Sequence, residues 1–230
     1  GELQIAKRIE DGLNQVLSAL SVYPRTVGKL IEIFGRVENE QARLTDVISG
    51  FADTDDHVAA PTPAVAGNAS SSDDSDDSEA AVDTGPDPKE VARHVRIMRE
   101  GYADLQTLLV EYGRDDERSR ACMKTVSEAF LQFKLVALVF QELADILRST
   151  IIRIRTQERN IMGLTVQSAG VPRKVFINSF PDNETNPDWV DTLIAKGAAY
   201  SARLEEYAPE IRRAQRKLQD IERENLLTIG

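Results

Sequence analysis

The stretch DPKEVARHVRIMREGYADLQTLLVEYG (87–113) decides the fold class of this chain. Its apolar residues recur three or four positions apart, which is the spacing of one face of an α-helix. These residues are Val91, Val95, Met98, Tyr102, Leu105, Leu108 and Tyr112. Asp87 can cap the amino end, Pro88 suits the first helical position, and Glu90 completes a box-like arrangement. The stretch is therefore predicted to be one amphipathic helix that runs as far as Gly113.

The same spacing continues on both sides of this helix. Toward the amino end it predicts a helix that finishes before Pro24, a second helix, and a short third stretch that stops at Gly50. Their apolar positions are Ile5, Ile9, Leu13, Val16 and Leu20; Val27, Leu30, Ile31, Phe34 and Val37; and Leu44, Val47 and Ile48. Toward the carboxyl end it predicts helices over 115–133 and 136–163, with Phe130, Phe133 and Phe140 as core anchors, and a short segment over 175–180.

The last part of the chain carries a heptad-like seam. Its apolar positions, which alternate four and three apart, are Tyr200, Leu204, Tyr207, Ile211, Ala214, Leu218 and Ile221. Pro209 either kinks this helix or begins a new one. No run alternates apolar and polar residues for long enough to predict a strand. The predicted class is all-α, an irregular helical bundle.

The segment 51–88 has a different composition. It contains ten acidic residues and no Lys or Arg, so it carries the whole formal charge of −10 and leaves 28 acidic against 28 basic residues elsewhere. It is rich in Ser, Pro, Gly and Ala and has too few large apolar side chains to offset the entropy of ordering a chain, so we predict a disordered acidic insert. Either it repels DNA or occupies a basic channel, or it is a tolerated surface insertion.

The sequence does not offer the residue patterns of an enzyme. The two histidines, His57 and His94, have no matched partners, and the single Cys122 is better explained as a structural, half-buried residue. No phosphate-binding glycine loop, zinc motif or cysteine ladder occurs, so no cofactor or metal is predicted. No apolar run approaches the length of a membrane span, charged residues interrupt the first apolar positions, and one cysteine fits a reducing compartment. We therefore expect a cytoplasmic, non-catalytic protein.

One group of basic residues is a candidate interaction site. In LRSTIIRIRTQERN (147–160), Arg148, Arg155 and Arg159 fall seven and four positions apart and share one helix face. Leu147, Ile151 and Ile154 are predicted to line the core side. The arginines either contact an acidic partner or phosphates, or pair within the chain, with residues such as Glu142, Asp145 and Glu158. The same two alternatives apply to the cluster Arg212, Arg213, Arg216 and Lys217.

Several stretches together resemble a bacterial primary (housekeeping) sigma factor of RNA polymerase. They are, in collinear order, GELQIAKRIEDGLNQV (1–16), QARLTDVISGF (41–51), EAFLQFKLV (128–136), IRIRTQERNIM (152–162), FINSFPDNET (176–185) and RRAQRKLQDIERENLLTIG (212–230). The resemblance spans essentially the whole chain. It runs from the end of the family's conserved region one, through its non-conserved region, to the approach of conserved region two. The basic, aromatic region that melts promoters and the promoter-reading helix-turn-helix have no counterpart here, so the chain is expected to be a fragment, and Trp189 is expected in a core.

The resemblance implies a division and a role. Residues 1–50 would end region one and open the non-conserved region, 51–88 would be the acidic insert, and 89–230 would be the helical non-conserved region leading to region two. In that family this region is a helical scaffold beside the promoter-melting region, which contacts the polymerase β′ subunit and the upstream edge of the minus-ten element. The implied partners are core RNA polymerase and, only within the complete holoenzyme, promoter DNA. The alternative is a docking platform for transcription regulatory proteins.

The resemblance also names one DNA-binding residue. Arg43 corresponds to the arginine of the family's ARL-[ST]-D motif, which reaches DNA near the minus-ten element. An arginine beside a helix end could contact a phosphate and carry no sequence information. The alternative is a surface salt bridge to Glu38, Glu40 or Asp46, worth about 0–1 kcal/mol.

Overall fold

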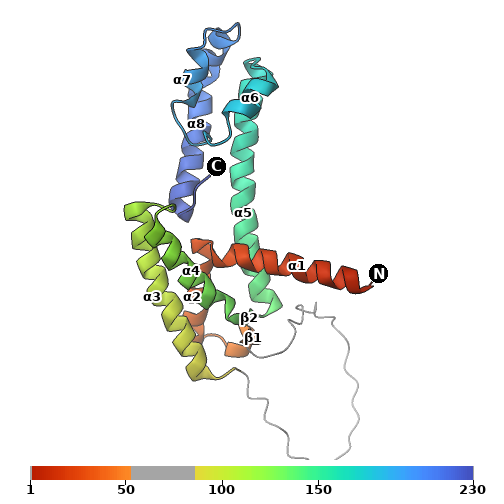
Figure 1. Cartoon of the computed structure of the whole chain (residues 1–230), viewed down its shortest axis with the longest axis vertical. Helices are drawn as coiled ribbons and strands as arrows, with labels where there is room; N and C mark the ends of the chain where they lie inside the picture. The colour runs from red at the N-terminus through yellow and green to blue at the C-terminus, as the bar shows by residue number, and fades with distance from the viewer. Residues whose placement is uncertain (1, 53–85, 230) are drawn as a thin grey trace, which may run out of the picture. The chain divides into compact units, whose positions relative to one another are not determined.

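A computed structural model describes residues 2–52 and 86–229, of which residues 2 and 3 are described only in their backbone (Figure 1). Helices dominate these ranges. In chain order the elements are α1 (Glu2–Ser21), α2 (Pro24–Glu38), the 3₁₀ turn η1 (Leu44–Asp46), β1 (Ile48–Phe51), α3 (Pro88–Tyr112), α4 (Glu117–Leu131), β2 (Phe133–Leu135), α5 (Ala137–Met162), the π-helical turn η2 (Gly163–Ser168), α6 (Arg173–Ser179), α7 (Trp189–Ile194) and α8 (Ser201–Asn225). The predicted all-α class is confirmed. No helix in the described ranges is long and apolar enough to cross a membrane.

The chain divides into two compact units, and each is described by itself. The first unit comprises Gly1–Val22, Thr26–Leu105 and Ala121–Ala144. The second comprises Tyr23–Arg25, Gln106–Arg120 and Asp145–Gly230. The division inferred from the sequence, into 1–50, 51–88 and 89–230, stays a prediction. The disordered acidic insert predicted over 51–88 falls almost wholly on residues 53–85, which lie outside the described residues.

The core of the first unit is built largely from the apolar faces that the helical spacing predicted, although Ile33 is buried and the expected Ile31 only half-buried. Its buried residues include Val27, Leu30, Ile33 and Phe34 of α2, Val91, Val95, Met98 and Leu105 of α3, and Val126, Ala129 and Phe130 of α4. Glycines allow these helices to pack closely. A Cβ at Gly28 of α2 would lie 2.6 Å from the hydroxyl of Tyr102 on α3, and one at Gly101 of α3 would lie 2.9 Å from Val126 of α4.

The first unit also contains a two-stranded antiparallel sheet, which the sequence did not predict. β1 pairs with β2 in the register Ile48↔Leu135, Gly50↔Lys134 and Phe51↔Phe133, with an irregularity between Ile48 and Gly50. The third helical stretch expected up to Gly50 is wrong, because only Leu44–Asp46 are helical and the next residues turn into β1. Such short strands show no alternation of their own, and their pairing depends on a partner more than 80 residues away in the chain.

The first helix departs from its predicted burial. Leu20 is buried, and Leu13 and Val16 are half-buried. Ile5 and Ile9, however, are 60% and 53% exposed. The spacing correctly predicts a helix with an apolar face, but burial needs a neighbour, and no described residue covers the first turns of α1.

The second unit has its own core around α8. Its buried residues include Ile161, Val171, Val190, Leu193, Leu204, Ile211, Leu218 and Ile221. An aromatic cluster adds to it, since the rings of Phe176 and Phe180 stack 4.7 Å apart and Trp189 meets Phe180 edge-on at 5.0 Å. Trp189 is only 3% exposed, which confirms its expected core role. α8 continues through Pro209 as one helix.

A buried polar network also belongs to the second unit. The Tyr23 hydroxyl donates to Oδ1 of Asn225 at 2.6 Å and lies 2.9 Å from the hydroxyl of Thr150. Arg25 donates to the same Asn225 oxygen at 3.1 Å, and the Asn225 amide donates to the carbonyl of Ile221. Burial raises the pKa of the Tyr23 hydroxyl, against the lowering influence of Thr150 and Arg25. The hydroxyl is therefore held in its neutral, donating form.

Candidate functional site

Arg43 lies at a fixed turn in the first unit. Its backbone N–H donates to the Asp46 carboxylate at 3.3 Å, and its carbonyl accepts from the Asp46 N–H at 3.1 Å. The residues that follow, Val47 and Ile48, are buried and anchor the turn at the start of β1. The backbone of Arg43 is thus held in place while its side chain is exposed.

The salt bridges considered for Arg43 from the sequence do not form. Glu38 forms an ion pair with Arg99 of α3 instead, whose Nη2 lies 3.1 and 3.0 Å from the two carboxylate oxygens. Asp46 accepts the backbone N–H of Arg43, as described above, and forms no ion pair with its guanidinium. No described residue pairs with the Arg43 guanidinium, which leaves it available to an external anion.

The three arginines of α5 lie on the surface of the second unit. Arg148 is exposed and forms a 2.9 Å ion pair with Asp145, one turn earlier. Arg155 and Arg159 are also exposed, and neither forms an ion pair with a described residue. Of the two alternatives considered from the sequence, pairing within the chain therefore describes Arg148. Arg155 and Arg159 pair with no described residue, so they are the candidates for contact with a partner.

The predicted core side of α5 is partly wrong. Ile151 is 41% exposed and Ile152 58% exposed, although Ile151 was expected inside. The face that turns inward consists of Thr150, Ile154, Gln157 and Ile161, which are buried or half-buried and follow helical spacing. Thr150 and Gln157 are polar, so hydropathy alone favoured a face rotated from this one.

An exposed apolar and basic surface results, which we call the α5 stripe. It consists of Arg148, Ile151, Ile152, Arg155 and Arg159. Sequence reasoning identified its three arginines but placed Ile151 in the core. The signal that could have found it is the spacing of Arg148, Ile152, Arg155 and Arg159, which are four, three and four apart and thus share a helix face.

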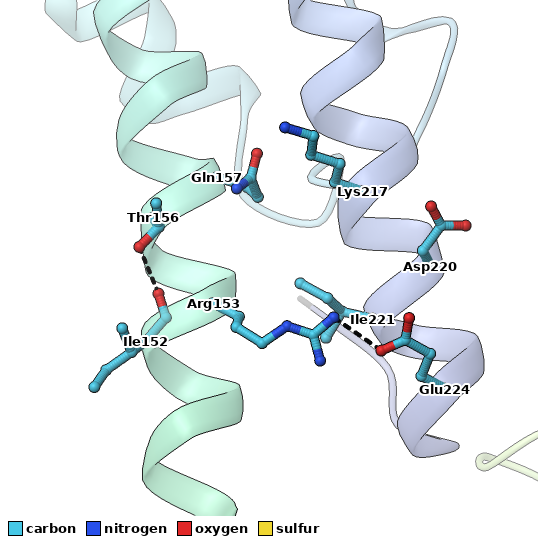
Figure 2. A pocket seen from close by; sticks show the side chains of 8 residues that line it. All are labelled: Ile152, Arg153, Thr156, Gln157, Lys217, Asp220, Ile221 and Glu224. Atoms are coloured by element: carbon cyan, nitrogen blue, oxygen red, sulfur yellow. Dashed lines mark hydrogen bonds and ion pairs between the residues drawn. The ribbon is translucent and has the colours of Figure 1, made fainter.

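A groove of about 330 Å³ separates α5 from α8 beside this stripe (Figure 2). It is lined by Ile152, Arg153, Thr156, Gln157, Lys217, Asp220, Ile221 and Glu224. Figure 2 shows Arg153 reaching from α5 to Glu224 of α8, an ion pair of 2.8 Å. Asp220 pairs with Arg223. Both acidic residues of the groove are thus neutralised within the chain, whereas Lys217 is exposed and pairs with no described residue.

A smaller hollow of about 290 Å³ lies at the carboxyl end of the stripe. It is lined by Glu158, Arg159, Met162, Phe176, Phe180 and Glu184. Burial raises the pKa of the Glu184 carboxyl, and the nearby charges of Glu158 and Asp182 raise it further. One Glu184 carboxylate oxygen is enclosed and accepts no hydrogen bond from the described residues. Ionisation of Glu184 is therefore less favourable in the folded chain than in the unfolded chain.

The remaining candidates from the sequence have structural surroundings. His94 lies against Phe51 and Phe133, whereas His57 lies outside the described residues. Cys122 is half-buried, its thiol donates to the Gly101 carbonyl at 3.3 Å, and burial raises its pKa. In the basic cluster of α8, Arg212 pairs with Asp191. Within the described ranges, no three His, Cys, Asp or Glu side chains converge to hold a metal ion.

The chain is thus a helical module with two exposed basic sites, one at Arg43 and one at the α5 stripe. The family described as "Sigma-70, non-essential region" matches residues 23–222. The chain therefore belongs to the sigma-70 family, over the region that this description calls non-essential.

A curated relative supports the same assignment. The RNA polymerase sigma factor RpoD of Neisseria gonorrhoeae is 23% identical to this chain over 245 aligned residues, which cover 99% of the chain and 38% of the relative. The chain thus spans less than half the length of that relative. The resemblance to a primary sigma factor, drawn from the six collinear motifs, is confirmed.

Proposed function

We propose that this chain works as part of a primary sigma factor that directs RNA polymerase to promoters in transcription initiation. Membership of the sigma-70 family and the similarity to an RNA polymerase sigma factor support this role. In this proposal the chain is a helical scaffold beside the promoter-melting region. It contacts the β′ subunit of core polymerase and the upstream edge of the minus-ten element. Such a role places the protein in the cytoplasm.

The observation that carries the DNA contact is the state of Arg43. Its backbone is fixed by the Asp46 turn, while its guanidinium is exposed and unpaired among the described residues. A side chain in this state can contact a phosphate without first losing an internal ion pair. Proteins that bind DNA tightly neutralise several phosphates, and each one adds about 0.9 to the slope of log affinity against log salt. A single arginine contact therefore contributes little affinity. The chain alone is therefore expected to bind promoter DNA negligibly at physiological salt.

The test uses the complete sigma factor bound to core polymerase. Arg43→Ala should slow open-complex formation, mainly at promoters with a poor minus-thirty-five element, and reduce its salt slope by about 1. Arg203→Ala, an exposed arginine of α8 with no ion pair to a described residue, is the matched control and should change neither. Equal loss at every promoter, with a lower melting temperature of the chain, would mean that Arg43 supports folding instead.

A second candidate function is a docking platform for transcription regulatory proteins. The observation in its favour is that Arg155 and Arg159 are exposed on one helix face with no ionic partner among the described residues. Arg148, already paired with Asp145, would take a smaller part. In this proposal the surface serves regulators while Arg43 serves DNA, so the two functions are compatible in one protein.

A further inference from the structure

The α5 stripe combines charge with exposed apolar surface in a fixed order. Arg148 is neutralised by Asp145 at one end. Ile151 and Ile152 follow, 41% and 58% exposed. Arg155 and Arg159 then provide two cations that no described residue pairs with. The stripe is therefore apolar in its centre and positively charged toward the carboxyl end of α5.

The spacing of these residues describes the chemistry of a partner. Ile152, Arg155 and Arg159 are three and four positions apart and therefore lie along one face of α5. From Arg148 to Arg159 this face measures about 16 Å, because a helix rises 1.5 Å per residue. A partner helix lying along it would need a large apolar side chain opposite the isoleucines and carboxylates one and two turns further on. Such a pattern is that of an acidic amphipathic helix.

On its α8 side, the surroundings of the stripe favour the same partner. The groove beside it contains two carboxylates, but Glu224 pairs with Arg153 and Asp220 with Arg223, so the negative charge of each is offset within the chain. Lys217, on the α8 side of this groove, adds a third exposed cation.

A nucleic acid fits this surface less well. Three arginines could neutralise phosphates, but Arg148 is already paired, and two exposed isoleucines occupy the centre of the stripe. An apolar centre flanked by charge is the arrangement of protein interfaces, in which the middle is desolvated and the rim remains polar. The isoleucines therefore favour a protein partner over a phosphate backbone.

We propose that the α5 stripe binds an acidic amphipathic helix, with an apolar anchor over Ile151 and Ile152 and carboxylates against Arg155 and Arg159. This proposal rests on the second candidate function, the docking platform, and specifies the class of partner. It is independent of the role proposed for Arg43 and of the DNA contact.

The test uses the full chain and a designed probe. The probe is a fluorescein-labelled helical peptide of about four turns with one leucine and with glutamates three and seven positions after it. We expect saturable binding by fluorescence anisotropy. Reversing both cations, Arg155→Glu with Arg159→Glu, should weaken binding at least about tenfold, since two attractions become repulsions. A peptide with lysines in place of the glutamates should recover binding to this reversed variant.

Matched variants separate the stripe from general effects of charge and stability. Arg173→Glu with Arg203→Glu reverses two exposed arginines elsewhere in the second unit and should leave binding unchanged. Ile152→Ser should weaken binding severalfold, whereas Ile177→Ser, at a similarly exposed residue (53%), should not. Circular dichroism checks that each variant is folded.

Three outcomes would overturn the proposal. They are no binding of the acidic peptide, equal binding by the stripe-reversed variant, and tight binding of a random DNA duplex that is lost on reversal while the peptide does not bind. The Arg43 promoter assay remains a separate measurement. A failure of this docking site therefore leaves the promoter role standing, and the reverse also holds.

Discussion

The buried network around Tyr23 gives the sharpest test of how the second unit is held together. Tyr23 is 5% exposed, Thr150 2% and Asn225 1%, so water cannot replace a lost hydrogen bond there. Tyr23→Phe keeps the ring and removes the hydroxyl that donates to Asn225 and meets Thr150. Asn225 then keeps the bond from Arg25 at its oxygen, and the Thr150 hydroxyl keeps its 3.2 Å bond to the Ile146 carbonyl.

The expected cost follows from these lost partners. The two hydrogen bonds of the Tyr23 hydroxyl each contribute about 0.5–1.5 kcal/mol, and a total loss of about 2 kcal/mol lowers the melting temperature by roughly 4–8 °C in a chain of this size. The measurement is urea and thermal unfolding followed by circular dichroism. Tyr207→Phe is the control, because Tyr207 is half-buried and its hydroxyl bonds to no described residue. It should change the free energy of unfolding by less than about 0.5 kcal/mol.

A double-mutant cycle then tests whether the network is shared. Tyr23→Phe and Thr150→Val remove two groups that lie 2.9 Å apart, so their effects should couple by about 0.5–3 kcal/mol. The native pKa of Tyr23 lies above its ordinary value of 10.0, so the stability it adds is complete below that pH and is lost as pH rises through the native pKa. The penalty of Tyr23→Phe should therefore stay constant up to about pH 10 and shrink above it. A penalty no larger than that of Tyr207→Phe, or no coupling, would refute the reasoning.

Three further predictions concern other parts of the chain. Gly35→Ala should raise the free energy of unfolding by about 0.5–1 kcal/mol, since nothing lies within 4 Å of the position that the added Cβ would take. Gly28→Ala in the same helix should lower the free energy of unfolding, because the added Cβ would meet the Tyr102 hydroxyl. Equal effects of the two substitutions in urea unfolding would contradict the packing described. Glu184→Gln should stabilise the chain at pH 7, and the gain should fade as pH falls toward 4.5, because below that value the carboxyl is protonated in both the native and the unfolded chain. Arg153→Ala breaks an exposed ion pair and should cost only about 0.2–1 kcal/mol, with the loss shrinking at high salt; a larger, salt-independent loss would show that its packing matters more.

At Arg43 and on α5, the sequence identified the basic residues of each site but not their ionic partners. The family motif names Arg43, and helical spacing places three arginines on one face. Neither shows whether these cations are free. Glu38, a candidate partner of Arg43, is taken by Arg99, which lies 61 residues away in the chain. Only the tertiary structure brings such competing partners together.

The sequence by itself determined the longer helices, the all-α class and the family, whereas the helical stretch expected up to Gly50 was wrong and α7 was not predicted. Helical spacing is a local property, because residues three and four apart share a face whatever lies opposite them. Trp189 as a core residue was an expectation drawn with the resemblance, because no Trp-rich region of the family is present around it.

The tertiary structure alone decided which helix faces are covered. The inward face of α5 contains Thr150 and Gln157, so hydropathy did not identify it, and Ile152 is left on the surface. The pairing of β1 with β2 and the exposure of Ile5 and Ile9 were likewise beyond the sequence. The reason is the same in each case. Burial and strand pairing depend on a neighbour that is distant in the chain, and the local spacing of residues does not depend on that neighbour.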